Sequence, residues 1–220
     1  MENLQQIAAL IGRCTDCDLH ASRINVVPGE GDSNAEIMFI GEGPGQHEDK
    51  QGRPFVGAAG NLLDEMLKAI GLSRGSVFIA NMVKCRPPSN RDPQPDEILA
   101  CSKYLDRQIE VINPLVVVTL GRFSLGKFFP GEGISKVRGS IRYYEGRPIY
   151  PMLHPAAALY RRELKETIYQ DFQALPDILN NLRRSKLTEP PSEHASTNMD
   201  EPPTQTVSYT HLTLPTNREV

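Results

Sequence analysis

A glycine-rich loop that carries three acidic residues follows one short apolar run of the chain. The apolar run occupies 37–40, and the loop reads Gly41-Glu42-Gly43-Pro44-Gly45-Gln46-His47-Glu48-Asp49. Such a density of glycine and proline ends a strand in a tight loop, whose backbone a second molecule can approach closely. Phosphate-binding loops usually add a lysine, whereas this loop adds acids. We therefore expect the floor of an active site for a small polar group; an ordinary strand-to-helix turn is the alternative.

Three further residues follow predicted strands in the same way. Asn81, Gly121 and His154 each come directly after an apolar or β-branched run. The carboxyl ends of parallel strands lie at one edge of a sheet, where ligands bind, so these residues and the loop at 41–45 are expected to share one crevice. Taken singly, Asn81 could instead cap a turn, and a histidine before Pro155 could have a structural role.

Four cysteines form a set that suits a metal centre. Cys14 and Cys17 make a C-x-x-C pair, and fifteen residues separate Cys85 from Cys101. We see no signal-peptide pattern and expect a reducing cytoplasm, where cysteines bind metals more often than they form disulfides. Zinc ribbons usually carry two short pairs, and the spread second pair suits a larger iron–sulfur cluster. From spacing alone these two centres are equal alternatives, and unrelated buried thiols are a third.

Hydrophobic periodicity indicates the elements that must position these residues. The predicted strands occupy 36–40, 76–80, 115–120, 141–144 and 148–152. The predicted helices occupy 3–12, 61–70, 96–112, 122–129 and 164–183. This alternation of strands with helices predicts an α/β domain with a mostly parallel sheet.

The composition fits one sizeable globular domain without a membrane segment. The 220 residues are 39% hydrophobic and 23% charged, with a net charge of −3, and no apolar stretch is long enough to span a bilayer. Residues 122–165 depart from this average, because nine lysines and arginines stand against three glutamates, a local excess of six positive charges. This segment predicts a surface for a polyanion; a solvated basic face is the alternative.

The character of the chain changes near residue 184. The segment at 189–206 is rich in proline, serine, threonine and acids without any period, which predicts disorder. The last thirteen residues, 208–220, resemble translated adapter sequence. We therefore divide the chain into one domain at 1–183 and a disordered tail at 184–220.

Five stretches carry a specific combination of motifs. They are Cys14-x-x-Cys17, GEGPGQHEDKQGRPFVGAAG at 41–60, NMVKCRPP at 81–88, Cys101, and HPAA at 154–157. Together they closely resemble the family 4 uracil-DNA glycosylases, which are iron–sulfur base-excision repair enzymes of bacteria and archaea. The resemblance covers residues 4–180 in the same order. It implies a single three-layer α/β/α domain, and a 4Fe–4S cluster, with zinc as the runner-up, bound by Cys14, Cys17, Cys85 and Cys101.

The resemblance implies hydrolysis of the N-glycosidic bond of a flipped-out deoxyuridine in DNA, which leaves free uracil and an abasic site. Phe55 would stack on the uracil ring, although a position in the core is its alternative. The amide of Asn81 would accept a hydrogen bond from ring N3–H and donate one to O4, a pair of contacts that cytosine cannot match. His154 would donate to O2 and stabilise the negative charge of the leaving base.

The resemblance also implies roles for residues of the acidic loop. Gly41, Glu42 and Gly43 would position the base and a water molecule, with Glu42 as the residue that orients or activates this water. Rejection of thymine requires a steric wall against one methyl group, and the family places that wall near Glu48. A related branch cross-links to DNA through a histidine in an inserted basic loop, and the sequence at 102–115 has no such insertion.

The expected partner is uracil-containing DNA, single- or double-stranded, bound by a monomeric enzyme that does not contact a membrane. Basic side chains of 122–165 would contact backbone phosphates, and residues 156–162 would fill the gap that the flipped base leaves. The cluster is expected to give structural support to the loop at 84–91, near the DNA. The alternative function is a non-catalytic iron–sulfur DNA-binding module associated with replication, which the intact catalytic motifs disfavour.

Overall fold

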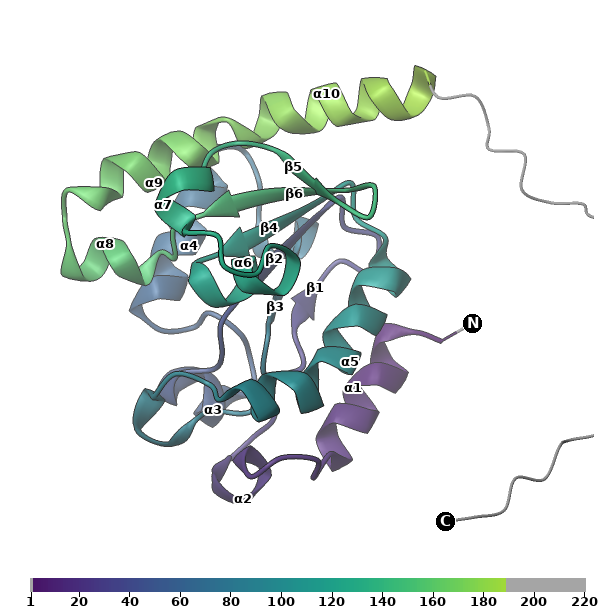
Figure 1. Ribbon diagram of the computed structural model, residues 1–220, viewed down its shortest axis with the longest axis vertical. Helices are drawn as coiled ribbons and strands as arrows, with labels where there is room; N and C mark the ends of the chain where they lie inside the picture. Colours follow the sequence, from purple (N-terminus) through teal and green to yellow (C-terminus); the bar gives the residue numbers. More distant parts are fainter. Residues whose placement is uncertain (1, 189–220) are drawn as a thin grey trace, which may run out of the picture. The chain divides into compact units, whose positions relative to one another are not determined.

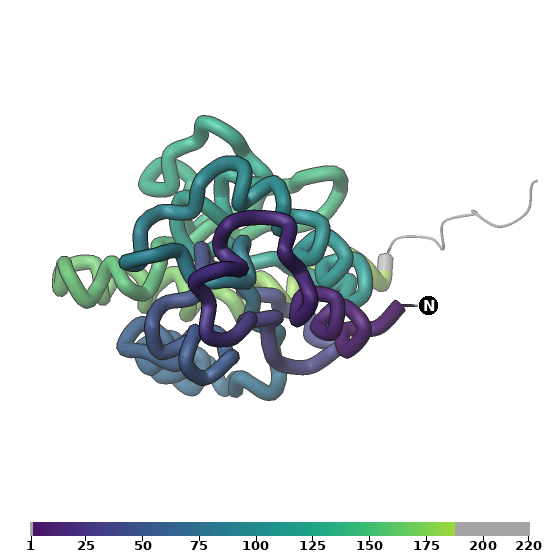
Figure 2. The backbone as a smooth tube through the Cα atoms, turned by 90° about the horizontal axis from the view of Figure 1, so that it is seen from below, coloured from purple at the N-terminus to yellow at the C-terminus, as the bar shows by residue number. Residues whose placement is uncertain are grey.

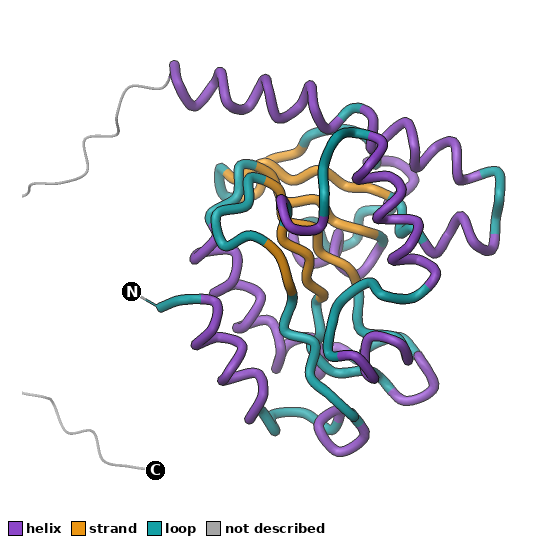
Figure 3. The backbone as a smooth tube through the Cα atoms, turned by 180° about the vertical axis from the view of Figure 1, so that it is seen from behind, coloured by secondary structure: helices purple, strands orange, loops and turns teal. Residues whose placement is uncertain are grey.

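A six-stranded sheet forms the centre of the structure (Figures 1 and 3). The computed structural model describes residues 2–188, with side chains as far as Leu187. The strand order in the sheet is β1-β3-β2-β4-β6-β5. The strands are β1 (Glu30–Gly31), β2 (Ile37–Gly41), β3 (Phe78–Asn81), β4 (Val116–Leu120), β5 (Arg142–Tyr144) and β6 (Arg147–Met152).

The four central strands run parallel, and the two edge strands run antiparallel to their neighbours. Every residue of β2, β3 and β4 is buried, which is typical of parallel strands covered on both faces. The mostly parallel α/β sheet predicted from the sequence is therefore confirmed.

Helices cover both faces of this sheet. They are α1 (Leu4–Arg13), α2 (Leu19–Ser22), α3 (Gln46–Gln51), α4 (Ala58–Ala69), α5 (Pro95–Ile112), α6 (Arg122–Phe128), α7 (Ile134–Val137), α8 (Ala156–Tyr160), α9 (Leu164–Gln173) and α10 (Leu175–Thr188), with 3-10 turns η1 (Arg74–Ser76) and η2 (Pro88–Asn90). Successive side chains of β2 point to opposite faces: Phe39 belongs to the core cluster of α4, α9 and α10, and Met38 to that of α5 and α6. Figure 2 shows α4 and α5 on opposite sides of the sheet, so the arrangement has three layers, α/β/α.

Two short helices that the sequence did not predict flank the strand ends. α3 begins inside the predicted loop, directly after its glycine-rich part at 41–45, so the last four residues of that loop are helical. Gly45 is extended (φ −88°, ψ −171°), and Glu48 and Asp49 lie in the first turn, where acidic side chains stabilise the helix dipole. α8 begins at Ala156, two residues after His154. Both helices have six residues or fewer, too few for a periodic hydrophobic pattern.

The last predicted helix differs from the structure in its continuity and its end. The prediction of one helix at 164–183 is wrong, since α9 ends before Ala174 and α10 starts at Leu175. Pro176 lies in the first turn of α10, the helix position that tolerates a missing N–H. α10 runs to Thr188, so the first residues of the predicted tail at 184–220 are helical, and 189–220 lie outside the described residues. Among the helices of residues 2–188, none is both long and apolar enough to cross a membrane.

Candidate active site

The chemically capable residues meet at the carboxyl edge of the parallel strands. β2 ends at Gly41 and β3 at Asn81, and these two residues are direct partners in the sheet register. The backbone N–H of Gly121 donates to the carbonyl of Met152 at 2.8 Å, so the ends of β4 and β6 are joined as well. A Cβ on Gly121 would lie only 3.2 Å from Cβ of His154. The four segments that the sequence placed at one edge therefore lie together.

A cleft of about 220 Å³ opens at this edge. It is lined by Glu42, Gly43, Pro44, Gly45, Glu48, Phe55, Ala59, Asn81, Pro87, Asn90, Arg91 and His154. Six residues predicted for the site line the cleft, and Gly41 lies beneath them in contact with Asn81 and Phe55. Ala59, Asn90 and Arg91 also line the cleft, and none of these three residues was predicted for the site from the sequence. The signal for the last two was the proline-rich segment that follows Asn81 in the chain.

Gly41 leaves the space in which the cleft side chains pack. A Cβ at this position would lie 2.4 Å from Oδ1 of Asn81 and 2.6 Å from Cζ of Phe55, distances that no real Cβ tolerates. The Phe55 ring also faces the imidazole of His154, with ring centroids 5.4 Å apart and an interplanar angle of 25°. Glycine is therefore required at 41 by close packing of two side chains rather than by a special backbone angle.

Asn81 presents an unpaired acceptor to the cleft. Its side chain is buried, and within residues 2–188 Oδ1 finds no hydrogen-bond partner. A buried polar atom without a partner costs about 1–3 kcal/mol, so such an atom at a cleft wall is suited to a donor on a ligand. The backbone carbonyl of Asn81 is held from behind by Nζ of the buried Lys84 at 2.8 Å, and the same ammonium donates to Oε1 of Gln108 at 2.7 Å.

His154 is a neutral hydrogen-bond donor toward the cleft at pH 7. Burial lowers the pKa of His154 to about 4, and the nearby carboxylate of Glu48 opposes this shift only in part. The backbone N–H of Ala156 donates to Nδ1 at 3.1 Å. A neutral imidazole that accepts at Nδ1 must carry its proton on Nε2. The local turn into α8 thus selects the tautomer that donates from Nε2.

The two acids of the cleft differ in their surroundings. Burial, and secondly the negative charge of Asp92, raise the pKa of Glu42, while Arg122 opposes the shift. The carboxylate of Glu48 accepts hydrogen bonds at Oε1 from the backbone N–H groups of Val56 and Gly57, both at 2.9 Å. Glu42 is therefore the carboxyl group with the raised proton affinity, and Glu48 is tied to the loop that follows Phe55.

The four cysteines converge on a second pocket, lined among others by Cys14, Cys17, Cys85 and Cys101. All four are free thiols. Nη1 of Arg23 donates to Sγ of Cys85 at 3.2 Å, and the backbone N–H of Lys84 to Sγ of Cys101 at 3.3 Å. Burial raises the pKa of Cys101 to about 11, although Lys84 opposes this shift. Four thiols with a guanidinium and an amide directed at them form a donor set that suits a sulfur-ligated metal centre.

The comparisons with known proteins agree with this geometry. Residues 28–173 match the model of the Uracil DNA glycosylase superfamily. The chain is 50% identical to the type-4 uracil-DNA glycosylase of Sulfurisphaera tokodaii over 188 residues, 81% of this chain and 86% of that protein. It is also 50% identical to the type-4 enzyme of Saccharolobus solfataricus, over 82% of this chain and 88% of that protein. For the type-4 enzyme of Archaeoglobus fulgidus the identity is 46%, over 81% of this chain and 94% of that protein.

The chain belongs to the uracil DNA glycosylase superfamily. The family that the motifs resembled is thereby confirmed.

Proposed function

We propose that the protein excises uracil from DNA in the cleft at the carboxyl edge of the sheet. It is a uracil-DNA glycosylase, a hydrolase that cleaves the bond between C1′ of deoxyuridine and N1 of the base and leaves an abasic site. The observation that best supports the cleft as its active site is the unpaired, buried Oδ1 of Asn81 beside the neutral, Nε2-protonated ring of His154.

The amide of Asn81 reads the Watson–Crick edge of the flipped base. Oδ1 accepts from N3–H of uracil, and Nδ2 donates to O4. Cytosine has an unprotonated N3 and an amino group in place of O4, so both contacts fail and buried polar groups stay unpaired, a mismatch worth roughly 10⁴-fold in discrimination. Lys84 supports this reading by holding the backbone carbonyl of Asn81 from behind.

His154 stabilises the leaving base. As the glycosidic bond breaks, its electron pair moves to the base, and Nε2–H of His154 donates to O2, where negative charge develops. Glu42 orients the water that attacks C1′ and accepts its proton. Phe55 stacks on the uracil ring, and Gly41 and Gly43 leave room for the base. Exclusion of thymine at Glu48 stays a prediction. The hydrogen bonds that its carboxylate accepts from Val56 and Gly57 give Glu48 a structural role as well.

The pH dependence of excision follows from these two groups. The rate should fall as the pH drops through the raised pKa of Glu42, because only the carboxylate accepts a proton from water. No fall is expected as the pH rises through 6.5, since His154 is already neutral above a pKa of about 4. Single-turnover rates against pH, with Glu42→Gln beside the wild type, measure this. A rate that falls as the pH rises through 6.5 would mean that His154 acts as a cation.

Cys14, Cys17, Cys85 and Cys101 would hold a 4Fe–4S cluster. The group supplies structural support rather than any step of bond cleavage. All four thiols line one pocket. Within residues 2–188, no three metal-ligating side chains lie close enough together to form a site for a single metal ion. The resemblance to the type-4 enzymes supports the iron–sulfur cluster over its runner-up, zinc.

Cys85→Ser should remove iron and slow excision together. Cys85 lies directly between Lys84, which supports Asn81, and the segment from Pro87 to Arg91, which forms one wall of the cleft. Iron content and visible absorption report the cluster, and the single-turnover rate reports the cleft. Ser102→Ala, at a half-buried position of α5 that does not line the cysteine pocket, is the control. Full iron content in Cys85→Ser would contradict the cluster assignment, and an iron-free protein with the wild-type rate would contradict the structural link between the cluster and the cleft.

The expected DNA surface is smaller than the basic run at 122–165 suggested. Five of its nine basic side chains form ion pairs within the domain: Arg122, Lys127, Arg138, Arg142 and Lys165. Arg161 and Arg162 have no ion-pair partner within residues 2–188, and they follow α8, on which Leu159 is 49% and Tyr160 88% exposed. These features support α8 as the wedge and the arginines after it as the phosphate contacts.

Tyr160→Ala should slow excision from duplex DNA about tenfold and leave excision from a single strand unchanged, because only a duplex must be unstacked, at a cost of a few kcal/mol. The ratio of the two single-turnover rates is the measurement. Leu187→Ala, 85% exposed on α10, is the matched control. Equal losses on both substrates would contradict a wedge at this position.

Incubation with an oligonucleotide that carries one uracil, followed by alkali, tests the proposed function. Strand breakage at uracil is the expected result. A protein that binds the oligonucleotide without breakage would be the non-catalytic module instead. Monomeric state and location in the cytoplasm stay predictions.

A further inference from the structure

Phe55, whose ring lines the cleft, has an unusual backbone conformation. Its φ angle is +52°, in the left-handed region that bulky side chains rarely adopt. The ring reaches the cleft wall from this conformation, against Gly41 and His154. Such a conformation persists only where surrounding contacts determine it.

Arg74, on η1 outside the cleft, holds the carbonyl groups on both sides of this position. Nη1 donates to the carbonyl of Phe55 at 2.9 Å, and Nη2 to that of Pro54 at 2.5 Å. The guanidinium is only 18% exposed and is fixed in turn by Glu30 at 2.8 Å and Asp64 at 3.0 Å. A planar guanidinium can reach two carbonyls and two carboxylates at once, which a lysine cannot do.

Two further contacts hold the peptide units that follow Phe55. Glu48 accepts from the N–H groups of Val56 and Gly57. Gly60 of α4 approaches the Phe55 carbonyl so closely that a Cβ there would lie 1.9 Å from its oxygen. The Phe55 backbone is therefore held by Arg74 on one side and by α3 and α4 on the other.

We infer that Arg74 is a positioning residue for uracil excision, which keeps the Phe55 ring in its stacking position from outside the cleft. The inference rests on the proposed function of the cleft. Without the two bonds from Arg74, Phe55 can relax toward negative φ, and its ring then leaves the wall. Misplacement of a positioning group by about 1 Å can cost about 100-fold in rate.

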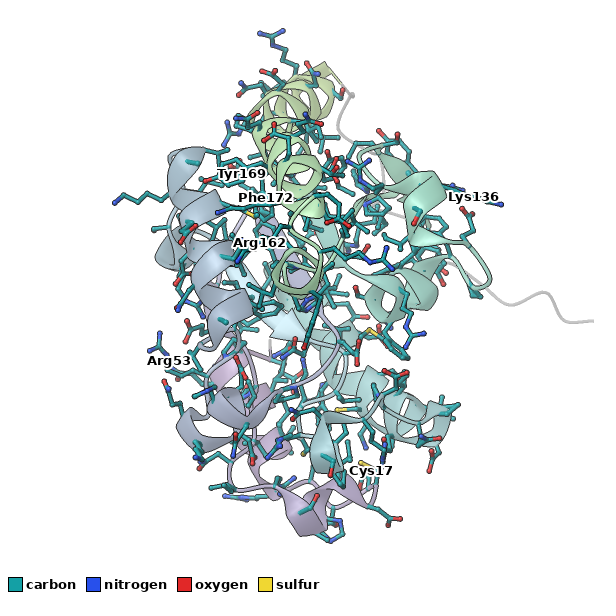
Figure 4. The ribbon with its side chains drawn as sticks, turned by 90° about the vertical axis from the view of Figure 1, so that its left-hand side faces the viewer. Cys17, Arg53, Lys136, Arg162, Tyr169 and Phe172 are labelled. Carbon is teal, nitrogen blue, oxygen red and sulfur yellow. The ribbon has the colours of Figure 1, made fainter. Side chains whose placement is uncertain are left out.

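Arg53 provides a matched control for Arg74. It donates to the same carboxylate, that of Glu30, at 2.7 Å, but its guanidinium makes no hydrogen bond to Phe55, and its side chain is 57% exposed. Figure 4 shows this side chain at the surface. The single-turnover rates of Arg74→Gln and Arg53→Gln are compared with the wild type on uracil DNA. We expect a loss of about 10- to 100-fold for Arg74→Gln and less than about 2-fold for Arg53→Gln, since exposed ion pairs contribute little.

The same pair of substitutions in a Phe55→Ala protein separates positioning from stability. If Arg74 acts through the Phe55 ring, Arg74→Gln adds less than about 3-fold there, because coupled residues are not additive. Should Arg74→Gln fail to fold, Arg74→Lys carries the test, since it keeps the charge and loses one carbonyl contact. Equal losses in both backgrounds, or a wild-type rate for a folded Arg74 variant, would overturn the inference. A wild type that leaves uracil in place would overturn the proposed function itself.

Discussion

His154→Ala is expected to slow uracil excision by about 100- to 1,000-fold, the usual effect of removing one donor to developing negative charge. The physical reason is that Nε2–H is available as a neutral donor at a half-buried position of the cleft, where its hydrogen bond to O2 is stronger than in water. His154→Gln should recover part of the loss, because an amide N–H can replace the donor. Single-turnover excision from an oligonucleotide with one uracil measures both variants.

The affinity for DNA should change little in His154→Ala, since phosphate contacts supply most of the binding free energy. His47→Ala is the matched control, because His47 is exposed on α3 and does not line the cleft. Wild-type excision by a folded His154→Ala protein would exclude this side chain from the chemistry. A loss of DNA binding equal to the loss of rate would mean that His154 binds rather than stabilises the transition state.

Asn81→Ala is expected to lower the rate on uracil by at least about 100-fold, because N3–H and O4 of a buried base would lose both partners. The variant should gain no activity on cytosine, since it offers no alternative pair of contacts. Rates on uracil, cytosine and thymine oligonucleotides, measured under identical conditions, test this.

Asn61→Ala serves as the control for Asn81→Ala, because Asn61 is an exposed asparagine on α4. Excision by Asn81→Ala at the rate of Asn61→Ala would remove Asn81 from base recognition. Thermal unfolding of both variants checks that the loss belongs to the cleft, and Asn81→Ala also relieves the unpaired Oδ1, so it should not be the less stable protein.

The convergence of the cleft residues was predictable from the sequence because it follows from topology. Gly41 and Asn81 each end a strand, His154 follows the end of β6 by two residues, and parallel strands bring those ends to one edge. The four cysteines were recognisable by type, and the structure adds that they line one pocket. Residue type and strand position together therefore predict which residues belong to the site, but not the contacts among them.

Contacts between side chain and backbone across the fold were not predictable in this way. Arg74 donates to the carbonyl of Phe55, nineteen positions away in the chain. No motif or hydrophobic pattern around Arg74 indicates this contact. The tautomer of His154 depends on the turn into α8, which is too short for a periodic pattern. The prediction of a basic surface at 122–165 rested on a count of charges, which does not reveal their partners. In the structure some of these basic side chains pair with carboxylates, as Arg138 does with Asp171. Packing decides these features after the elements are in place.

Identification of the base released by the full chain is the most direct test of uracil excision in this cleft. The wild type, Asn61→Ala and Asn81→Ala are each incubated with a mixture of oligonucleotides carrying uracil, thymine or cytosine, and free bases are measured by mass spectrometry. Free uracil alone is expected, in equal amounts from the wild type and Asn61→Ala and strongly reduced from Asn81→Ala. Release of no base, or equal release of uracil by Asn81→Ala, would contradict uracil excision in this cleft.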